Sequence, residues 1–133
     1  MTLAIDTNVL VRLLVRDDER QFAVVQRLLQ DAQAREQPVS VPLLVILETE
    51  WVLRSRYRKS KAAIAQALTM LLEADDVAID DEATLEEALH LWKNHGADFA
   101  DCLIAARAAR LGCTQFATFD AEAAKLPRGH LLA

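Results

Sequence analysis

The sequence predicts an α/β fold with helices on both faces of a parallel β-sheet. Short apolar segments alternate along the chain with longer segments of helical periodicity, and this alternation is typical of parallel strands that are connected by helices. The chain has 133 residues, of which 53% are hydrophobic. This is enough for a continuous core without disulfide or metal support. Because no internal repeat or linker-like stretch interrupts the sequence, we expect one domain over residues 1–133.

Caps and prolines set the element boundaries in the first half of the chain. Asp6 and the two polar residues after it end a short apolar strand and cap a helix. Pro42 suits the first turn of a helix, and Ser60 is a further N-cap. The elements expected here are a strand at 3–5, helices at 9–15 and 19–34, a strand at 39–41, a helix from 42 to about 56, and a helix at 61–73.

Glycines mark the helix ends in the second half of the chain. Gly96 follows one helix, and Gly112 is expected in the left-handed conformation that ends the next, which Asp98 caps. The elements expected here are a strand at 77–79, a helix at 81–94, a helix from 98 to 111, a strand at 115–118, and a last strand at 130–132.

The formal net charge of −5 argues against a protein that binds nucleic acid through its overall charge. It is compatible with an enzyme that needs a metal cation before it approaches a polyanion. The longest apolar stretch is far shorter than the ~20 residues of a membrane span, and Asp6 interrupts the N-terminal apolar segment, which no basic region precedes. We therefore expect no membrane association and a cytoplasmic location.

Cys102 and Cys113 are the only cysteines. Along the predicted helix they are separated by roughly 16 Å, too far for a disulfide, and no histidine lies at zinc-ligand spacing. We expect two buried free thiols.

Two of the predicted strands end directly in an aspartate, Asp6 and Asp120. In open parallel sheets, ligands bind outside the carboxyl ends of the strands, so both carboxylates are expected at the binding edge. The alternative interpretation is that each aspartate only ends a strand and caps the next turn.

A third acidic side chain, Glu48, lies in a helix that is apolar on nearly every face. It shares its face with Leu44, Trp51 and Val52, so we expect it to be partly buried. A buried charge is usually bound to a metal or paired, here with an arginine as the alternative. Glu50 points elsewhere on the helix and is expected in solvent.

Asp98 and Asp101 are three residues apart at the start of a predicted helix. This spacing places both carboxylates on one face near the positive end of the helix dipole, and a capping box is the alternative. All five acidic residues offer oxygen ligands, with no accompanying cysteine or histidine. Such a donor set favours Mg²⁺ or Mn²⁺ over zinc.

Four segments with these acidic residues span most of the chain, and together they resemble the motifs of PIN-domain proteins, in particular the VapC-type ribonuclease toxins of toxin–antitoxin pairs. The segments are Ile5-Asp6-Thr7-Asn8-Val9-Leu10, Leu47-Glu48-Thr49-Glu50-Trp51-Val52-Leu53-Arg54, Asp98-Phe99-Ala100-Asp101-Cys102-Leu103-Ile104-Ala105-Ala106 and Ala117-Thr118-Phe119-Asp120. Each motif is weak by itself, whereas their order and spacing together are specific.

The resemblance implies a three-layer α/β/α sandwich around a parallel sheet of four to five strands. It also implies Mg²⁺ or Mn²⁺ as cofactor, cleavage of single-stranded RNA, a homodimer and a cognate antitoxin protein. The metal ligands expected on this basis are Asp6, Glu48, Asp101 and Asp120, with Asp98 as a further ligand or a supporting group. Hydrogen bonds from Thr7, Asn8 and Thr118 are expected to orient carboxylates or water.

A basic segment follows the helix that carries Glu48. Its cations are Arg54, Arg56, Arg58, Lys59 and Lys61, with Tyr57 among them. We interpret the first four cations as residues that bind RNA, with Tyr57 as an aromatic side chain that stacks on a base. The alternative is a solvated helix end, where the cations lie near the negative end of the helix dipole. Trp51 and Trp92 are interpreted as core or dimer contacts rather than base-stacking groups.

Two other functions remain open from the sequence. One is an aspartyl-phosphate phosphotransfer domain with Asp6 as nucleophile, although no second aspartate follows it two residues later. The other is a non-catalytic, PIN-like binding module. The high apolar content also predicts exposed apolar patches, which are typical of protein interfaces. An arginine of an antitoxin tail is expected to pair with the acidic residues.

Overall fold

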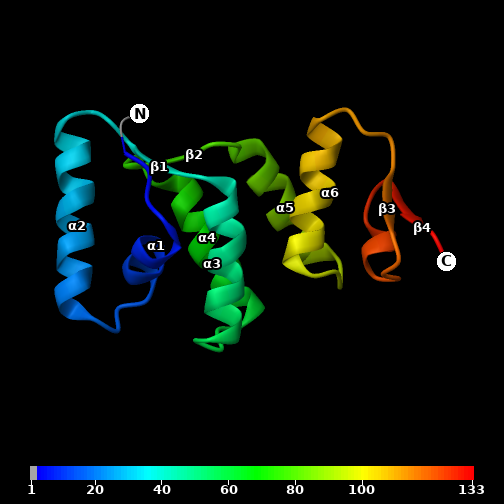
Figure 1. Ribbon diagram of the computed structural model, residues 1–133, viewed down its shortest axis with the longest axis horizontal. Coiled ribbons are helices and arrows are strands. Elements are labelled where there is room, and N and C mark those ends of the chain that lie inside the picture. Colours follow the sequence, from blue (N-terminus) through cyan, green and yellow to red (C-terminus); the bar gives the residue numbers. More distant parts are fainter. Residues whose placement is uncertain (1–2) are drawn as a thin grey trace. The chain divides into compact units, whose positions relative to one another are not determined.

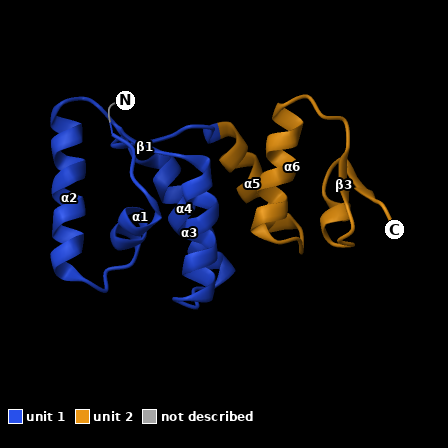
Figure 2. Ribbon diagram, viewed as in Figure 1, with its two compact units in different colours: residues 1–82 blue, residues 83–133 orange. Residues whose placement is uncertain are grey.

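The computed structural model describes residues 3–133 and divides the chain into two compact units, unit 1 over residues 1–82 and unit 2 over residues 83–133 (Figure 2). In both units helices alternate with short parallel strands (Figure 1). This confirms the α/β class that the alternating pattern predicts. The two units are described separately below.

Unit 1 contains six of the named elements, and most of them start and end where the sequence predicts. Three helices and both strands match the expected ranges to within one residue at each end, whereas the first helix begins two residues early. The elements are α1 (Thr7–Leu14), α2 (Glu19–Ala34), β1 (Val39–Val41), α3 (Leu43–Ser55), α4 (Lys61–Glu73) and β2 (Val77–Ile79).

The strands of unit 1 are parallel and lie in a fixed register. Val39, Ser40 and Val41 of β1 are paired with the three residues of β2 in order. On its other edge β1 is joined by the segment 3–5, because Ser40 N donates to Leu3 O and Ile5 N donates to Ser40 O. The strand predicted at 3–5 is therefore present as a single parallel bridge rather than as a full ladder.

Side-chain caps explain where the helices of unit 1 begin. Asp18 accepts a hydrogen bond from Gln21 N, and Ser60 accepts one from Ala63 N. Pro42 occupies the N-cap position of α3 and makes no side-chain cap bond. Instead, Asp80 Oδ1 accepts from Leu43 N at 2.8 Å across the unit. The residue after β2 therefore fixes the start of the helix that carries Glu48.

The core of unit 1 lies where its helices meet one another and the strands. Helix α1 packs against α2 and α3, and α4 packs against α3 and β2. Buried apolar side chains come from each of these elements, and those that are fully buried include Leu10, Ile46, Leu68, Val39 and Val41. Burying one such side chain contributes about 1.5–3 kcal/mol to folding.

Unit 2 contains α5 (Glu82–Asn94), α6 (Phe99–Arg110), β3 (Phe116–Thr118), the 3₁₀ helix η1 (Ala123–Lys125) and β4 (Gly129–Leu131). Strands β3 and β4 are parallel. The expected fifth strand is thus β4, one residue earlier than predicted. The chain turns tightly before β4, where a Cβ on Gly129 would lie 2.3 Å from the Ala124 carbonyl oxygen, so glycine is required there.

The core of unit 2 is aromatic. Trp92 of α5 and Phe99 of α6 are both buried and contact each other edge to face, with ring centroids 5.0 Å apart. Trp92 is therefore a core residue, as expected. Leu85, Ala88 and Cys102 are buried in the same unit.

One cysteine prediction is wrong and the other is right. Neither cysteine forms a disulfide within residues 3–133, and Cys102 is buried, but Cys113 is exposed. The reason is the helix end: Gly112 has a φ of +86°, and the left-handed residue turns the chain away from α6. Cys113 therefore leaves the buried face of the helix.

Within residues 3–133, none of the helices combines the length and the apolar character required to cross a bilayer.

Candidate functional site

Asp6 stands between the segment 3–5 and α1, at the carboxyl end of a strand segment of unit 1. It is exposed and occupies the N-cap position of α1. Its Oδ1 accepts a hydrogen bond from Val9 N at 3.1 Å. The capping role proposed as an alternative is thus present, and it uses one of the two carboxylate oxygens.

Thr7 and Glu48 connect α1 to α3. Thr7 is buried, and its hydroxyl donates a short hydrogen bond to Glu48 Oε1. Because this bond joins two helices that also pack against each other, it orients the Glu48 carboxylate relative to the first turn of α1. Asn8 is exposed and follows in the same turn.

The predicted environments of the two α3 glutamates are wrong. Glu48 is exposed, whereas Glu50 is 3% exposed. The inward face of α3 is Ile46, Thr49, Glu50 and Leu53, at the i, i+3, i+4, i+7 spacing of one helix face. Since α3 is apolar on nearly every side, its sequence periodicity does not show which face is buried.

Arg54 forms the ion pair of this helix. Its Nε lies 2.8 Å from Glu50 Oε2, one turn away on the helix. The arginine partner expected as an alternative for Glu48 is thus found at Glu50. The sequence signal that identifies this pair is a glutamate followed four residues later by an arginine.

Tyr57 takes part in a hydrogen-bond network that sequence reasoning missed. Its hydroxyl accepts from Arg12 Nη1 at 3.1 Å and donates to Asp17 Oδ2 at 3.0 Å. Arg12 Nη1 also pairs with Asp17 at 3.1 Å. The hydrogen bond with Tyr57 and the charge of Asp17 raise the pKa of the Arg12 guanidinium above its usual value. This network joins α1, the turn before α2 and the segment after α3.

In unit 2, Asp98 and Asp101 lie in the first turn of α6. Asp98 occupies the N-cap position, but its side chain makes no cap hydrogen bond, so the capping box given as the alternative interpretation does not form. Burial raises the pKa of the Asp101 carboxyl, and the negative charges of Asp120 and Asp98 raise it further. The three carboxylates of unit 2 therefore lie close enough to repel one another.

Asp120 follows β3 and shapes the turn that leads to η1. Its Oδ1 accepts hydrogen bonds from Glu122 N at 2.8 Å and Ala123 N at 3.1 Å. Thr118 Oγ1 accepts from the backbone N–H of Asp120 at 3.0 Å. Thr118 thus supports the backbone of Asp120 rather than its carboxylate.

The structure groups the predicted site residues in two sets. Unit 1 holds Asp6, Thr7, Asn8 and Glu48, and unit 2 holds Asp98, Asp101, Thr118 and Asp120. Over residues 3–133, no three acidic, histidine or cysteine side chains are grouped closely enough to hold a metal ion. Neither set is therefore a complete metal site by itself.

The individual carboxylates nevertheless fit a hard divalent cation. Asp6, Glu48 and Asp120 are each held by hydrogen bonds to one oxygen, and within residues 3–133 their second oxygen accepts none. Oxygen donors oriented in this way are the ligands that Mg²⁺ and Mn²⁺ prefer. At Asp101, a cation would relieve the repulsion that raises the carboxyl pKa.

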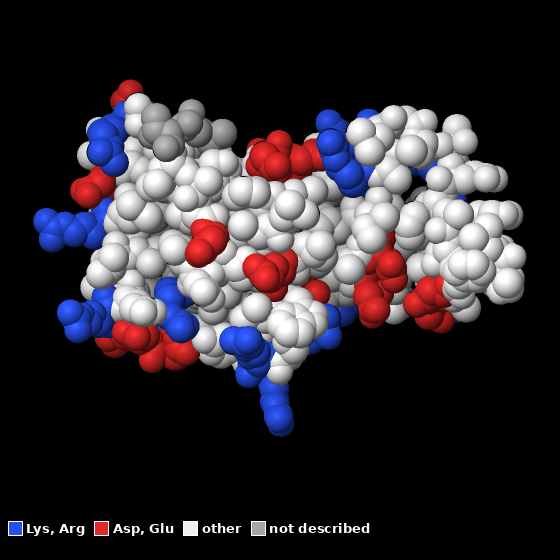
Figure 3. All heavy atoms as spheres, viewed as in Figure 1, with Lys and Arg blue, Asp and Glu red and all other residues white. Residues whose placement is uncertain are grey.

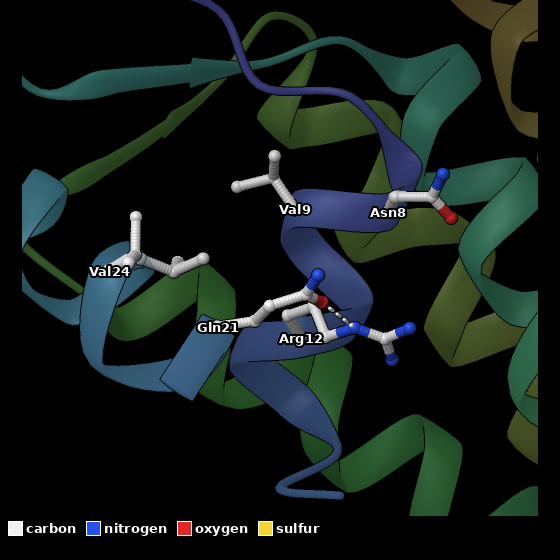
Figure 4. A pocket seen from close by; sticks show the side chains of 6 residues that line it. Asn8, Val9, Arg12, Gln21 and Val24 are labelled. Carbon is white, nitrogen blue, oxygen red and sulfur yellow. Dashed lines mark hydrogen bonds between the residues drawn. The ribbon is translucent and has the colours of Figure 1, made fainter. Parts of the chain in front are cut away.

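A cavity of about 290 Å³ lies between α1 and α2 of unit 1 (Figure 4). It is lined by Asn8, Val9, Arg12, Gln21, Val24 and Val25. Arg12 Nε donates a short hydrogen bond to Gln21 Oε1 across the two helices. Its lining has no carboxylate, but it includes Asn8, one of the predicted site residues.

The basic segment lies at the end of α3 that leads into α4, where Figure 3 shows basic side chains at the bottom of the view. Arg56, Arg58 and Lys59 are exposed. Arg58 has a φ of +52°, which marks the turn between the two helices. Arg54 differs from these three cations because it is bound to Glu50.

The pKa of Asp101 predicts a pH-dependent effect on stability. A carboxyl group whose pKa is raised on folding destabilises the folded protein at pH values above that pKa. This destabilisation disappears as the pH falls below the pKa of the same group in the unfolded chain, about 3.9. In chelator at pH 7, Asp101→Asn is expected to raise the melting temperature by about 2 °C, since Asp101 is only partly buried. A calorimetric pH series measures this, and the gain should shrink toward pH 4.

Asp31→Asn is the matched control for this series, because Asp31 is exposed on α2. Added Mn²⁺ should stabilise the unmodified chain more than Asp101→Asn, because ligand binding to the folded state alone raises stability. A melting temperature of Asp101→Asn at or below that of the unmodified chain at every pH would contradict the prediction.

Comparison with known proteins places these residues in a family. The PIN domain family profile matches residues 3–129, across both units. A VapC ribonuclease of Aquifex aeolicus (strain VF5) is 22% identical over 122 residues, which cover 92% of this chain and 90% of that protein. The range matched by the family profile spans Asp6, Glu48, Asp98, Asp101 and Asp120. The chain therefore belongs to the PIN domain family.

Proposed function

We propose that this protein is a metal-dependent endoribonuclease that cleaves single-stranded RNA and acts as the toxin of a toxin–antitoxin pair. Membership of the PIN domain family supports the nuclease class. The similarity to a VapC ribonuclease supports RNA as the substrate and a toxin as the biological role. The proposed ligands of Mg²⁺ or Mn²⁺ are Asp6, Glu48, Asp101 and Asp120, with Asp98 as a further ligand or a support for the others.

One observation carries this proposal. Asp6, Glu48 and Asp120 come from three different segments, and each is oriented by a hydrogen bond that uses only one carboxylate oxygen. Exposed acids also serve as purely structural caps, as Asp18 does for α2, but Asp6, Glu48 and Asp120 lie in segments that resemble PIN-domain motifs. Oriented acids at these three positions suit a metal-dependent nuclease.

We also propose that residues 1–133 form one PIN domain. The family match across residues 3–129 supports this. When bound, the ion lowers the pKa of water and stabilises negative charge on the phosphate oxygens.

The residues of the chain have distinct tasks in this mechanism. Thr7 keeps the Glu48 carboxylate in one orientation, and the α1 cap keeps Asp6 in place. The turn after β3 holds Asp120 through two backbone N–H groups. Asp101, whose carboxyl is the most crowded of the set, gains most from a cation. No nucleophilic side chain is required.

The test is cleavage of single-stranded RNA by the purified protein with Mg²⁺, with Mn²⁺ and with a chelator. We expect cleavage with either ion and none with the chelator. Cleavage at an unchanged rate in the chelator would contradict the metal-dependent mechanism. Stable labelling of Asp6 by a small phosphodonor, with no RNA cleavage under any condition, would instead favour the phosphotransfer function.

The proposed partners are a second copy of the chain and an antitoxin. Apolar side chains such as Leu44, Met70 and Ile104 are at least half exposed, which is typical of surfaces that bind other proteins. We expect a homodimer in sedimentation experiments and inhibition by an arginine-bearing partner encoded beside it. A monomer at micromolar concentration would refute the first expectation, and full activity with saturating partner would refute the second.

A further inference from the structure

The two tryptophans of this chain lie in opposite environments. Trp92 is 5% exposed and packs on Phe99, whereas Trp51 on α3 is 51% exposed. No aromatic or cation–π contact of Trp51 is found within residues 3–133. Of the two roles expected for Trp51, the core position is therefore wrong, and the dimer contact stays a prediction. A half-exposed indole presents a flat, polarisable face to the surroundings, and this is the feature on which nucleic-acid bases stack.

The position of Trp51 on α3 relates it to the proposed site and to the basic segment. Glu48 precedes it by three residues, and side chains at this spacing are neighbours on one helix face, with Cβ atoms about 5–6 Å apart. Toward the other end of the helix, the chain continues into the exposed cations Arg56, Arg58 and Lys59. Trp51 thus lies between a proposed metal ligand and a group of positive charges.

The basic segment is held in place by Tyr57. The tyrosine hydroxyl is bonded to both Arg12 and Asp17, so the turn after α3 is tied to α1. Tyr57 is itself partly buried, with its hydroxyl engaged inside unit 1, whereas Trp51 is exposed. The exposed aromatic side chain nearest to the cations along the chain is Trp51.

We propose that Trp51 is a stacking platform for a base of single-stranded RNA, and that Arg56, Arg58 and Lys59 bind the phosphates that flank it. These four residues are named the α3 strip. An exposed aromatic side chain next to clustered cations is the combination that binds single strands without strong sequence preference. The inference rests on the proposed function, since it concerns how the same substrate is bound.

A protein partner is the competing occupant of Trp51, and the charges argue against it. The centres of protein interfaces are depleted of charged residues, whereas Trp51 has Glu48 one turn before it and the three cations of the strip after it. A self-complementary contact through Trp51 would bring two copies of these charges together. RNA phosphates, in contrast, are complementary to the cations.

The experiment uses the whole chain in chelator, so that binding is measured without cleavage. A short single-stranded oligoadenylate is titrated into the protein, and tryptophan fluorescence is followed. Stacking on Trp51 should quench its emission, while buried Trp92 keeps its own. Trp51→Leu should remove the quenching and weaken binding of a labelled oligonucleotide by about 10-fold. Trp51→Phe should retain most of the affinity.

Two further variants provide a control and separate base stacking from phosphate binding. Leu111→Ala, at a 65% exposed apolar side chain of unit 2, is the control and should leave RNA affinity unchanged. The triple change of Arg56, Arg58 and Lys59 to alanine should reduce the slope of log affinity against log salt by about 2, because each phosphate contact on a single strand contributes about 0.7. Trp51→Leu should leave that slope unchanged.

The results distinguish this inference from the proposed function. Unchanged affinity of Trp51→Leu would overturn the stacking role, even if the unmodified chain cleaves RNA. Loss of the dimer in Trp51→Leu, without loss of RNA affinity, would overturn it in favour of a protein contact. Quenching and weakened binding as expected, without cleavage in Mg²⁺ or Mn²⁺, would support the strip and contradict the nuclease mechanism.

Discussion

Asp6→Asn and Asp101→Asn are each expected to reduce RNA cleavage by more than about 100-fold, although they lie in different units. Changing a group that only supports a metal ligand already reduces metal affinity or activity by about 10–100-fold. The loss of a ligand itself should reduce activity by at least as much. Asn retains the side-chain oxygen that caps α1 at Asp6. At Asp101 it removes a charge that is repelled by its neighbours. Both variants should therefore fold.

Single-turnover cleavage and calorimetric titration with Mn²⁺ measure this prediction. Each single variant is expected to lose Mn²⁺ affinity, because each removes a proposed ligand. Asp31→Asn, an exposed carboxylate on α2, should keep full activity. Unchanged Mn²⁺ affinity and cleavage in either variant would contradict the role of that residue as a metal ligand.

Arg54→Ala is expected to destabilise the protein by about 2 kcal/mol. Glu50 is buried, and Arg54 Nε at 2.8 Å is its ion-pair partner. Removing one partner of a buried pair leaves an uncompensated charge, which costs about 3–5 kcal/mol. We expect less here because the Arg54 side chain is 54% exposed and water can reach part of the pair.

Urea unfolding of Arg54→Ala and Arg56→Ala measures this effect with a matched control. Arg56 is exposed, and within residues 3–133 it makes no ion pair, so its removal should change stability by less than about 0.5 kcal/mol. The double variant Glu50→Gln/Arg54→Ala should recover part of the lost stability, because the buried charge is then absent. Equal stability of the two single variants would refute the role of Glu50.

Local chemistry explains why the boundaries of so many elements could be predicted. Asp18 and Ser60 cap α2 and α4 through bonds to residues three positions later, and Gly112 adopts the left-handed conformation that ends α6. Each of these signals acts within one helix turn. The start of α3 is different, since its cap comes from Asp80, 37 residues away.

The α3 helix shows where sequence periodicity is insufficient. Apolar residues occur on almost all its sides, so the pattern does not show whether Glu48 or Glu50 is the buried side chain. Packing against α1 and α4 selects Ile46, Thr49, Glu50 and Leu53 as the inner face, because these helices cover one side of α3 only. The same choice exposes Trp51. The sequence-based environments of Glu48 and Glu50 were therefore wrong, and for Trp51 only the core position was wrong.

The sequence alone determined the α/β class, the caps and the acidic positions, because these depend on periodicity and on residue types at motif spacing. Only the tertiary structure decided which groups restrain those acids. The Thr7 hydroxyl reaches Glu48 across 41 positions, and Tyr57 reaches Asp17 across 40. Contacts between such distant residues depend on how helices pack, and no local pattern encodes that packing.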